Sequence, residues 1–326
     1  MISFFRCARR LAATPIALGL ALVAATSAIA QAYPTKSIKI VVAYPPGQST
    51  DIATRYFASK LSAALNAGVV VENRPGAFGN IGTAYAARAT PDGYTLVMGA
   101  SGTHALNPAL YDNIGYDAEK DFEPIIATAF IPMVISVNPS SNINSLAELI
   151  QLAKTRPDKI DVAVPSVTAQ LVLEMIKLQK VPLFAIKYKG SGEAMTALLG
   201  NQVPVLIDTV AASRSQFGKI KPLAVTSAKP MTALPDLKSV AQQGLDGFNV
   251  VAWNALMAPR GTPVKVRDRI ETEMRKILAL PETAKALHDL GFEPAPTMNH
   301  AQLVAWLHSE RTTDAEIIKS ANMKAE

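Results

Sequence analysis

The stretch from Ile38 to Arg55 constrains the fold of this chain most. It reads IKIVVAYPPGQSTDIATR: an apolar, β-branched run stops at Pro45-Pro46-Gly47, and Thr50-Asp51 then opens an amphipathic helical pattern. This order predicts a strand, a rigid turn and a helix N-terminus, where free backbone N–H groups and the positive end of the helix dipole point to one place. No histidine, cysteine or acid pair accompanies the turn. The segment therefore favours a site that holds an anion over a site of catalysis.

The first thirty residues predict a secretory signal peptide. Arginines stand among the first ten residues, Leu11–Ala25 is apolar, and Ala28-Ile29-Ala30 is a small-x-small cleavage site. Cleavage is expected near Ala30. The apolar run is too short for a permanent membrane anchor. We therefore expect an exported protein that loses its only cysteine, Cys7, with the signal.

Composition excludes several classes of function for the remaining chain. Removing the signal's three arginines from 32 basic residues leaves 29 against 26 acidic ones, a net charge of +3 without any basic block, so nucleic-acid binding is not expected. The four histidines lack partners at metal-ligand spacing. There is no P-loop, dinucleotide fingerprint or nucleophile elbow. We expect no metal, no cofactor and no enzymatic activity.

Short apolar runs alternate with longer amphipathic ones, which is typical of an α/β protein with a largely parallel sheet. The pattern restarts near Asp161 and predicts two α/β lobes, joined by crossing strands because no low-complexity linker is present. Ile125–Val137 contains Pro132 and is expected to span two elements. The expected strands are Ile38–Ala43, Gly68–Glu72, Tyr94–Met98, Asp161–Val164, Phe184–Tyr188, Val203–Ile207, Pro222–Thr226 and Val250–Met257. The expected helices are Asp51–Leu65, Asn80–Ala89, Ser145–Thr155, Ala169–Leu178, Glu193–Leu199, Pro263–Leu278, Glu282–Leu290 and His300–Ser320.

The loops that follow the expected strands are the candidate ligand site, because ligands of open parallel sheets lie at the carboxyl ends of the strands. Four loops rich in hydroxyl residues, glycine and proline stand there: Tyr44–Asp51, Asn73–Asn80, Gly99–Pro108 and Pro165–Gln170. Capping of a helix by Ser49, Thr50 or Asp51 is an alternative role for the first loop, and one residue can do both.

Several motifs in order carry a resemblance that covers almost the whole expected mature chain. They are Tyr33-Pro34-Thr35-Lys36, Pro45–Asp51, Glu72–Gly76, Gly79–Gly82, Pro91–Leu96, His104–Pro108, Tyr188-Lys189-Gly190, Leu198-Leu199-Gly200, Trp253 and Ala258–Pro263. Each motif alone is weak, but their number, order and spacing are specific. Together they resemble the tripartite tricarboxylate transporter receptor family, also called the Bug family of periplasmic solute-binding proteins.

The resemblance implies a two-lobed periplasmic-binding-protein fold (type II, Venus flytrap) that closes on a small organic carboxylate. One lobe would comprise residues 31–130 and 226–326 and the other residues 131–225, with hinges near 131 and 225. Backbone amides and hydroxyls of facing loops would hold the ligand. The implied contacts are Gly47, Gln48, Ser49, Thr50, Asp51, Ser101 and His104 from the first lobe, and Ser166, Val167, Thr168 and Asp208 from the second.

Two departures from the family pattern bear on the ligand. Gln48 replaces a glycine, and Val164–Leu171 lacks the two glycines and the histidine of the family's corresponding loop. Without glycine the backbone approaches an anion less closely. The distal half of the pocket is therefore expected to differ in shape, which leaves open an aromatic or bulkier carboxylate, or the loss of transport function.

The expected partners are the acid itself and separately encoded membrane subunits of a tripartite tricarboxylate-type transporter, with the receptor a monomer. A partner of a signalling or sensor protein that uses the same carboxylate clamp is the alternative. The sequence does not separate the two.

Overall fold

The computed structural model describes residues 33–156 and 160–324. The chain divides into two units, Met1–Thr35 and Lys36–Glu326, and the described helices and strands all lie in the second. The predicted signal peptide, its cleavage site and Cys7 lie outside the described residues.

One mixed sheet of ten strands, counted over the described residues, runs through the second unit in the order β2-β1-β3-β9-β4-β7-β5-β6, with β8 and β10 also paired to β4. Its first half holds β1 (Ile38–Val42), β2 (Val69–Asn73), β3 (Thr95–Ala100), β9 (Val251–Pro259), β10 (Glu293–Pro294) and the first part of β4 (Phe122–Val137). Strand β1 is parallel to both β2 and β3, with Ile40 opposite Val71 and Leu96. Strand β9 is antiparallel to β3 and β4.

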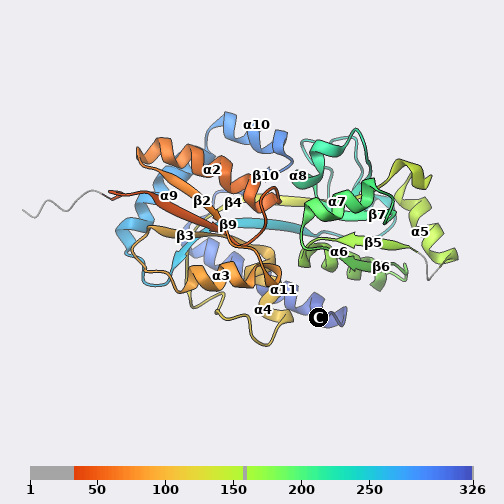
Figure 1. The fold of residues 1–326 in the computed structure, drawn as a ribbon, viewed down its shortest axis with the longest axis horizontal. Helices are drawn as coiled ribbons and strands as arrows, with labels where there is room; N and C mark the ends of the chain where they lie inside the picture. The colour runs from red at the N-terminus through yellow and green to blue at the C-terminus, as the bar shows by residue number, and fades with distance from the viewer. Residues whose placement is uncertain (1–32, 157–159, 325–326) are drawn as a thin grey trace, which may run out of the picture. The chain divides into compact units, whose positions relative to one another are not determined.

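Helices cover both faces of this first half. In the sheet, β2 lies on one side of β1 and β3 on the other, so the connection from β1 to β2 and the connection from β2 to β3 run in opposite directions across the sheet. Because both connections are right-handed crossovers, their helices, α2 and α3, lie on opposite faces. Figure 1 shows α2 and α9 on one face and α3 and α11 on the other. The bounds are α2 Ser49–Leu65, α3 Asn80–Ala87, α4 Asn107–Leu110, α9 Val264–Leu278, α10 Pro281–Leu290 and α11 His300–Ser320.

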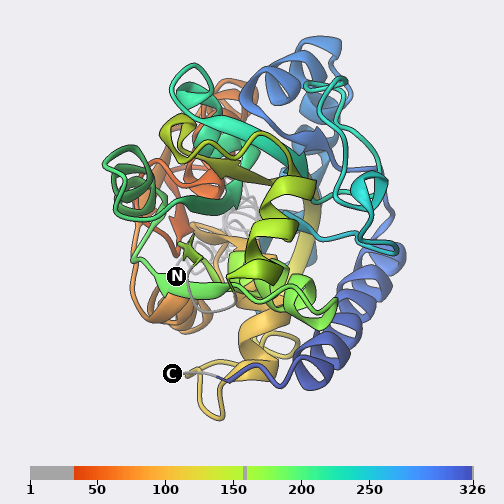
Figure 2. The same cartoon turned by 90° about the vertical axis from the view of Figure 1, so that its right-hand side faces the viewer.

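The second half repeats the same construction around shorter strands. Its elements are the rest of β4, β5 (Asp161–Val164), β6 (Phe184–Lys187), β7 (Val205–Thr209), β8 (Lys221–Val225), α5 (Leu146–Thr155), α6 (Val167–Leu178), α7 (Ser191–Leu199) and α8 (Val210–Ser213). Strand β5 is parallel to β6 and β7. Figure 2 looks from the end that carries these elements, with dark-blue α11 along one side. Ser145 caps α5, its hydroxyl accepting a hydrogen bond from the Glu148 N–H.

Strand β4 joins the two halves, and here the prediction of two elements in Ile125–Val137 was wrong. The strand is continuous and changes partners in its middle: Pro132 is the last residue opposite β9, and Met133 is the first opposite β7. Proline has no N–H to donate to a ladder, and a change of partners is a place where a strand tolerates that loss. The predicted hinge near residue 131 lies at this change. The lobe limits and the hinges stay predictions.

Gly99–Pro108 was expected as a loop, but most of it is helical. A π-helical turn spans Gly102–Leu106 and leads directly into α4. The turn is buried throughout, and Pro108 follows it near the start of α4, where a missing N–H is tolerated. Most other element bounds agree with the sequence prediction within two residues.

The core fixes where the strands end. The residues of β1 other than Lys39 are at most 1% exposed, and in the second half Val162, Leu171 and Ile207 lie in one buried cluster. The carboxyl ends of β1, β3, β5 and β7 lead into α2, the π-helical turn, α6 and α8. Because β7 runs opposite to β3 across the shared strand β4, the carboxyl ends of the two halves face each other, and these four connections meet between the halves.

Candidate ligand-binding site

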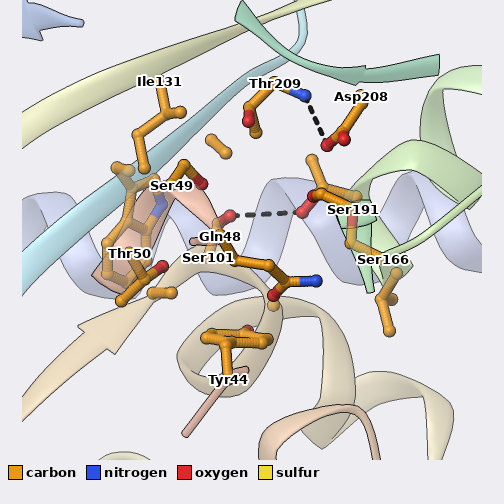
Figure 3. A pocket seen from close by; sticks show the side chains of 16 residues that line it. Tyr44, Gln48, Ser49, Thr50, Ser101, Ile131, Ser166, Ser191, Asp208 and Thr209 are labelled. Carbon is orange, nitrogen blue, oxygen red and sulfur yellow. Dashed lines mark hydrogen bonds between the residues drawn. The ribbon is translucent and has the colours of Figure 1, made fainter. Parts of the chain in front are cut away.

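A small cavity lies between the two halves of the sheet, where these connections meet. It has a volume of about 40 Å³. We call it the inner cavity. Figure 3 shows it with Tyr44 at the bottom of the view and Asp208 and Thr209 at the top. Its lining is Tyr44, Gln48, Ser49, Thr50, Ala100, Ser101, Gly102, Ile131, Ser166, Val167, Thr168, Ser191, Asp208, Thr209, Ala252 and Trp253.

Three helices of eight or more residues begin at this cavity. The first turn of α2 contributes Ser49 and Thr50, that of α6 contributes Val167 and Thr168, and α7 begins at Ser191. The first N–H groups of a helix have no intrahelical acceptor, and the helix dipole places partial positive charge there. The inner cavity therefore offers an anion several donors from both halves of the sheet.

The turn before α2 is held by Asp51, which is not part of the cavity lining. Its carboxylate accepts hydrogen bonds from the Gly47 N–H (2.9 Å), Arg55 (2.9 Å) and Asn73 Nδ2 (2.8 Å). Burial alone would raise the pKa of Asp51, but these hydrogen bonds and the Arg55 charge hold it below its usual range. Asp51 thus fixes the loop that carries Gln48 and Ser49.

The Thr50 side chain is oriented from the neighbouring sheet. Asn254 on β9 is fully buried, and its Nδ2 donates to Thr50 Oγ1 (3.1 Å) and to the Gly99 carbonyl (3.3 Å). Because Thr50 Oγ1 accepts this bond, its own proton is available to a group in the cavity.

Hydroxyl groups face each other across the cavity. Ser101 Oγ lies 3.4 Å from Thr168 Oγ1, and Figure 3 marks this hydrogen bond from Ser101. Ser166 caps α6 by accepting from the Ala169 N–H (3.1 Å), so its hydroxyl proton is also free to donate. The loop without the family's glycines thus supplies a capped helix N-terminus to the second half of the site.

Asp208 is the one carboxyl group in the lining, counted over the described residues. It is 2% exposed, and its Oδ1 accepts from the Thr209 N–H at 2.7 Å. Its Oδ2 is buried and meets no hydrogen-bond partner among the described residues. Burial raises the pKa of Asp208 to about 6. A proton, a water molecule or a donor group of the ligand is needed to satisfy this oxygen.

The structure brings eight of the eleven predicted contacts together. Those in the lining are Gln48, Ser49, Thr50, Ser101, Ser166, Val167, Thr168 and Asp208. The other three, Gly47, Asp51 and His104, are not in the lining.

His104 is fully buried behind the site. Its Nδ1 shares a hydrogen bond with Thr103 Oγ1 (2.9 Å), and its ring packs on Phe122 with 4.8 Å between centroids. Burial, with the charge of Arg311, lowers the pKa of His104 to about 3, so the ring is neutral at ordinary pH.

Sequence reasoning missed several residues of the site. Tyr44 stands in the predicted first loop, and Ser191 directly follows the Tyr188-Lys189-Gly190 motif, so both had a local signal. Trp253 belongs to a family motif in the sequence but was not among the predicted ligand contacts. Asn254 has no local signal at all, because only the pairing of β9 with β3 places it beside Thr50.

The described ranges, residues 33–156 and 160–324, hold neither a metal-ligating cluster nor a membrane-spanning helix. No three His, Cys, Asp or Glu side chains there gather closely enough to hold a metal ion. None of the described helices is long and apolar enough to cross a membrane.

Comparison with known proteins bears on the family and the fold. The model of the tripartite tricarboxylate transporter family receptor matches residues 53–323. A UPF0065 protein of Bordetella bronchiseptica is 34% identical over 322 residues, which cover 97% of this chain and 94% of the relative.

Solved structures superpose over most of the chain and confirm the predicted periplasmic-binding-protein fold. R. palustris Rpa4515 with adipate has a TM-score of 0.87 at 32% identity and covers 90% of this chain and 99% of its own. The periplasmic binding protein BugD has a TM-score of 0.84 at 35% identity, with coverage of 90% and 100%. The chain therefore belongs to the tripartite tricarboxylate transporter receptor family of solute-binding proteins.

Proposed function

We propose that this protein is a periplasmic receptor that binds the carboxylate group of an organic acid in the inner cavity. As a monomer, it would deliver the acid to separately encoded membrane subunits of a tripartite tricarboxylate-type secondary transporter. The observation that carries the proposal is the convergence of the N-termini of α2, α6 and α7 on a cavity whose described lining contains no cationic side chain.

This arrangement suits a carboxylate better than a neutral or cationic group. A carboxylate accepts up to about four hydrogen bonds, and a hydrogen bond to a charged group contributes about 1.5–3 kcal/mol. The proposed donors are the backbone N–H groups at the start of α2 and α6 and the hydroxyls of Thr50, Ser101 and Ser166. Because most of the lining residues are buried, these bonds are stronger than they would be at the surface.

Three further assignments complete the proposal. Gly47 and Asp51 act through the loop before α2, and His104 supports the π-helical turn that follows Ser101. Asp208 contacts the ligand from the second half of the sheet. The adipate bound to Rpa4515, a relative of similar fold, supports a carboxylate as the ligand.

A binding screen of the mature protein tests the proposal. The panel covers C4–C6 diacids, citrate, acidic amino acids, nicotinate and the phthalate isomers, read by thermal shift and then by calorimetry. A ligand at a hundredfold excess over its Kd stabilises the native state by about 2.7 kcal/mol. We expect at least one acid to bind, and Thr50→Val and Ser101→Ala to weaken it about tenfold each. A panel without any binder would contradict the receptor function.

Cell experiments test the partner and the location. Uptake of the identified acid is expected to require this gene, and the Thr50→Val variant is expected to restore it poorly. The protein is expected in the periplasmic fraction with an N-terminus near Gln31. Unchanged uptake without the gene would refute the transporter partner and leave ligand binding intact.

A further inference from the structure

The inner cavity has room for one end of an organic acid only. A water molecule needs about 10–15 Å³ of such volume, so about 40 Å³ admits a carboxylate with one or two waters. A ligand with a longer body must therefore extend out of the inner cavity in one direction.

Two larger cavities adjoin the inner one and share lining residues with it. A cavity of about 330 Å³ beside α11 shares Ser101 and Thr168 with the inner cavity. The Ser101–Thr168 hydrogen bond stands between the two cavities, and the cavity beside α11 is lined by two carboxyl groups, Glu310 and Asp314, which suit an apolar ligand body poorly. The second cavity, of about 530 Å³, shares Tyr44, Gln48 and Ser166. We call this second cavity the outer chamber.

The outer chamber has largely apolar walls built from both halves of the sheet. Pro45, Pro75 and Phe78 line it from the first half, and Pro165 lines it from the second. Lys189 and Glu193 are exposed side chains that also border it. An apolar ring or chain gains free energy by leaving water for such walls, roughly 25 cal/mol for each Å² buried.

Gln48 stands where the two spaces meet. It is 8% exposed, and it precedes α2 without capping the helix through its side chain. Gly190 of the second half lies close to this side chain: a Cβ atom added to Gly190 would be 3.1 Å from Gln48 Nε2. The side-chain amide of Gln48 therefore packs against the Gly190 backbone. Its donor and acceptor are thus held at the passage between the cavities.

We propose that the outer chamber receives the body of the ligand, an apolar ring or chain of about five carbons or more attached to the carboxylate in the inner cavity, and that Gln48 determines specificity where the two parts join. This inference rests on the proposed function, since it assumes the carboxylate in the inner cavity. It assigns the ligand to acids with an apolar body and excludes acetate-sized acids as the preferred substrate.

Phe78 offers a direct test, because its side chain lines the chamber while its backbone holds the loop. The Phe78 carbonyl accepts from Asn107 Nδ2 (3.1 Å), a contact that a Phe78→Ala variant keeps. Phe184 on the edge strand β6 is 45% exposed and does not line the chamber, so Phe184→Ala is the matched control.

The experiment measures Kd by calorimetry for acetate, hexanoate and phenylacetate, with succinate and adipate as a diacid series. Wild type is expected to bind hexanoate or phenylacetate tenfold or more tightly than acetate, and the diacids show whether a charge at the far end of the chain is tolerated. Phe78→Ala is expected to remove most of this difference and to change the Kd of the short acid less than twofold. Phe184→Ala should change neither. Tighter binding of hexanoate alone would identify a chain as the body of the ligand, and tighter binding of phenylacetate alone would identify a ring.

A second variant keeps the test valid if Phe78→Ala folds poorly. Ala77 is exposed, lines the chamber and has φ 45°, a conformation that asparagine adopts readily. Ala77→Asn makes the wall polar and is expected to weaken the longer acids severalfold.

The outcomes separate the two proposals. Equal affinity for short and long acids, or equal losses for both in Phe78→Ala, would overturn the outer chamber while the carboxylate receptor stands. Binding by none of these acids or of the wider panel would refute the receptor function itself.

Discussion

Asn254 Nδ2 lies 3.1 Å from Thr50 Oγ1 and donates a hydrogen bond to it, although the two residues are 204 positions apart in the sequence. This bond fixes the direction of a hydroxyl at the start of α2. Asn254 is outside the cavity lining, so its effect on a ligand passes through Thr50.

We predict that Asn254→Ala weakens ligand binding about tenfold, because the Thr50 hydroxyl loses its orientation. Loss of the buried amide should also lower the free energy of unfolding by about 1–3 kcal/mol. Calorimetry gives the affinity and urea unfolding gives the stability. Thr128→Ala is the control: Thr128 Oγ1 donates to the Asn254 carbonyl (3.1 Å) away from the cavity, and this variant should lose stability without losing affinity. Equal affinity of Asn254→Ala and wild type would contradict the positioning role.

Asp208→Asn is expected to stabilise the ligand-free protein at neutral pH. The folded-state pKa of about 6 stands above the ordinary 3.8, so the folded state binds the proton more tightly and stability is lost as pH rises from about 4 through 6. The two-unit shift corresponds to about 3 kcal/mol at pH 7. Unfolding curves between pH 4 and 7.5 should show the advantage of Asp208→Asn shrinking toward pH 4. A difference that does not depend on pH would rule out a raised pKa.

Asp51→Asn should change stability in the opposite sense. Its folded-state pKa is lowered, so the ionised carboxylate stabilises the fold above the ordinary pKa, and this contribution is lost as pH falls through the folded-state pKa. Asparagine keeps an acceptor for the Gly47 N–H but loses the charge that pairs with Arg55. We expect a loss of about 1 kcal/mol at pH 7 and a Kd within about threefold of wild type. A large loss of affinity at unchanged stability would instead place Asp51 on the ligand.

His104→Leu tests whether this histidine touches the ligand. The ring is neutral and buried, and its Nε2 has no partner among the described residues, so an apolar side chain of similar size should be tolerated. We expect the free energy of unfolding to change by less than about 2 kcal/mol and the Kd to stay within about twofold. A tenfold weaker Kd with normal unfolding would show a direct contact.

Much of the fold could be read from the sequence because its signals are local. The apolar run Ile38–Ala43, the helix Ser145–Thr155 and the restart at Asp161 depend on neighbouring residues, and the structure has these elements within one residue of the predicted bounds. The first loop, with Gln48, Ser49 and Thr50, was found for the same reason: a strand that ends before a helix N-terminus leaves donors free wherever it occurs.

The sequence alone determined an α/β chain with an anion-favouring turn and the order of its strands and helices. Only the tertiary structure decided that β4 runs unbroken through Pro132, that His104 is buried outside the cavity lining, that Asn254 orients Thr50, and that the inner cavity adjoins the outer chamber at Gln48. Local order follows from backbone and side-chain preferences within a few residues. Contacts between distant segments depend on how strands pair and on which groups are left buried, and no short stretch of sequence specifies either.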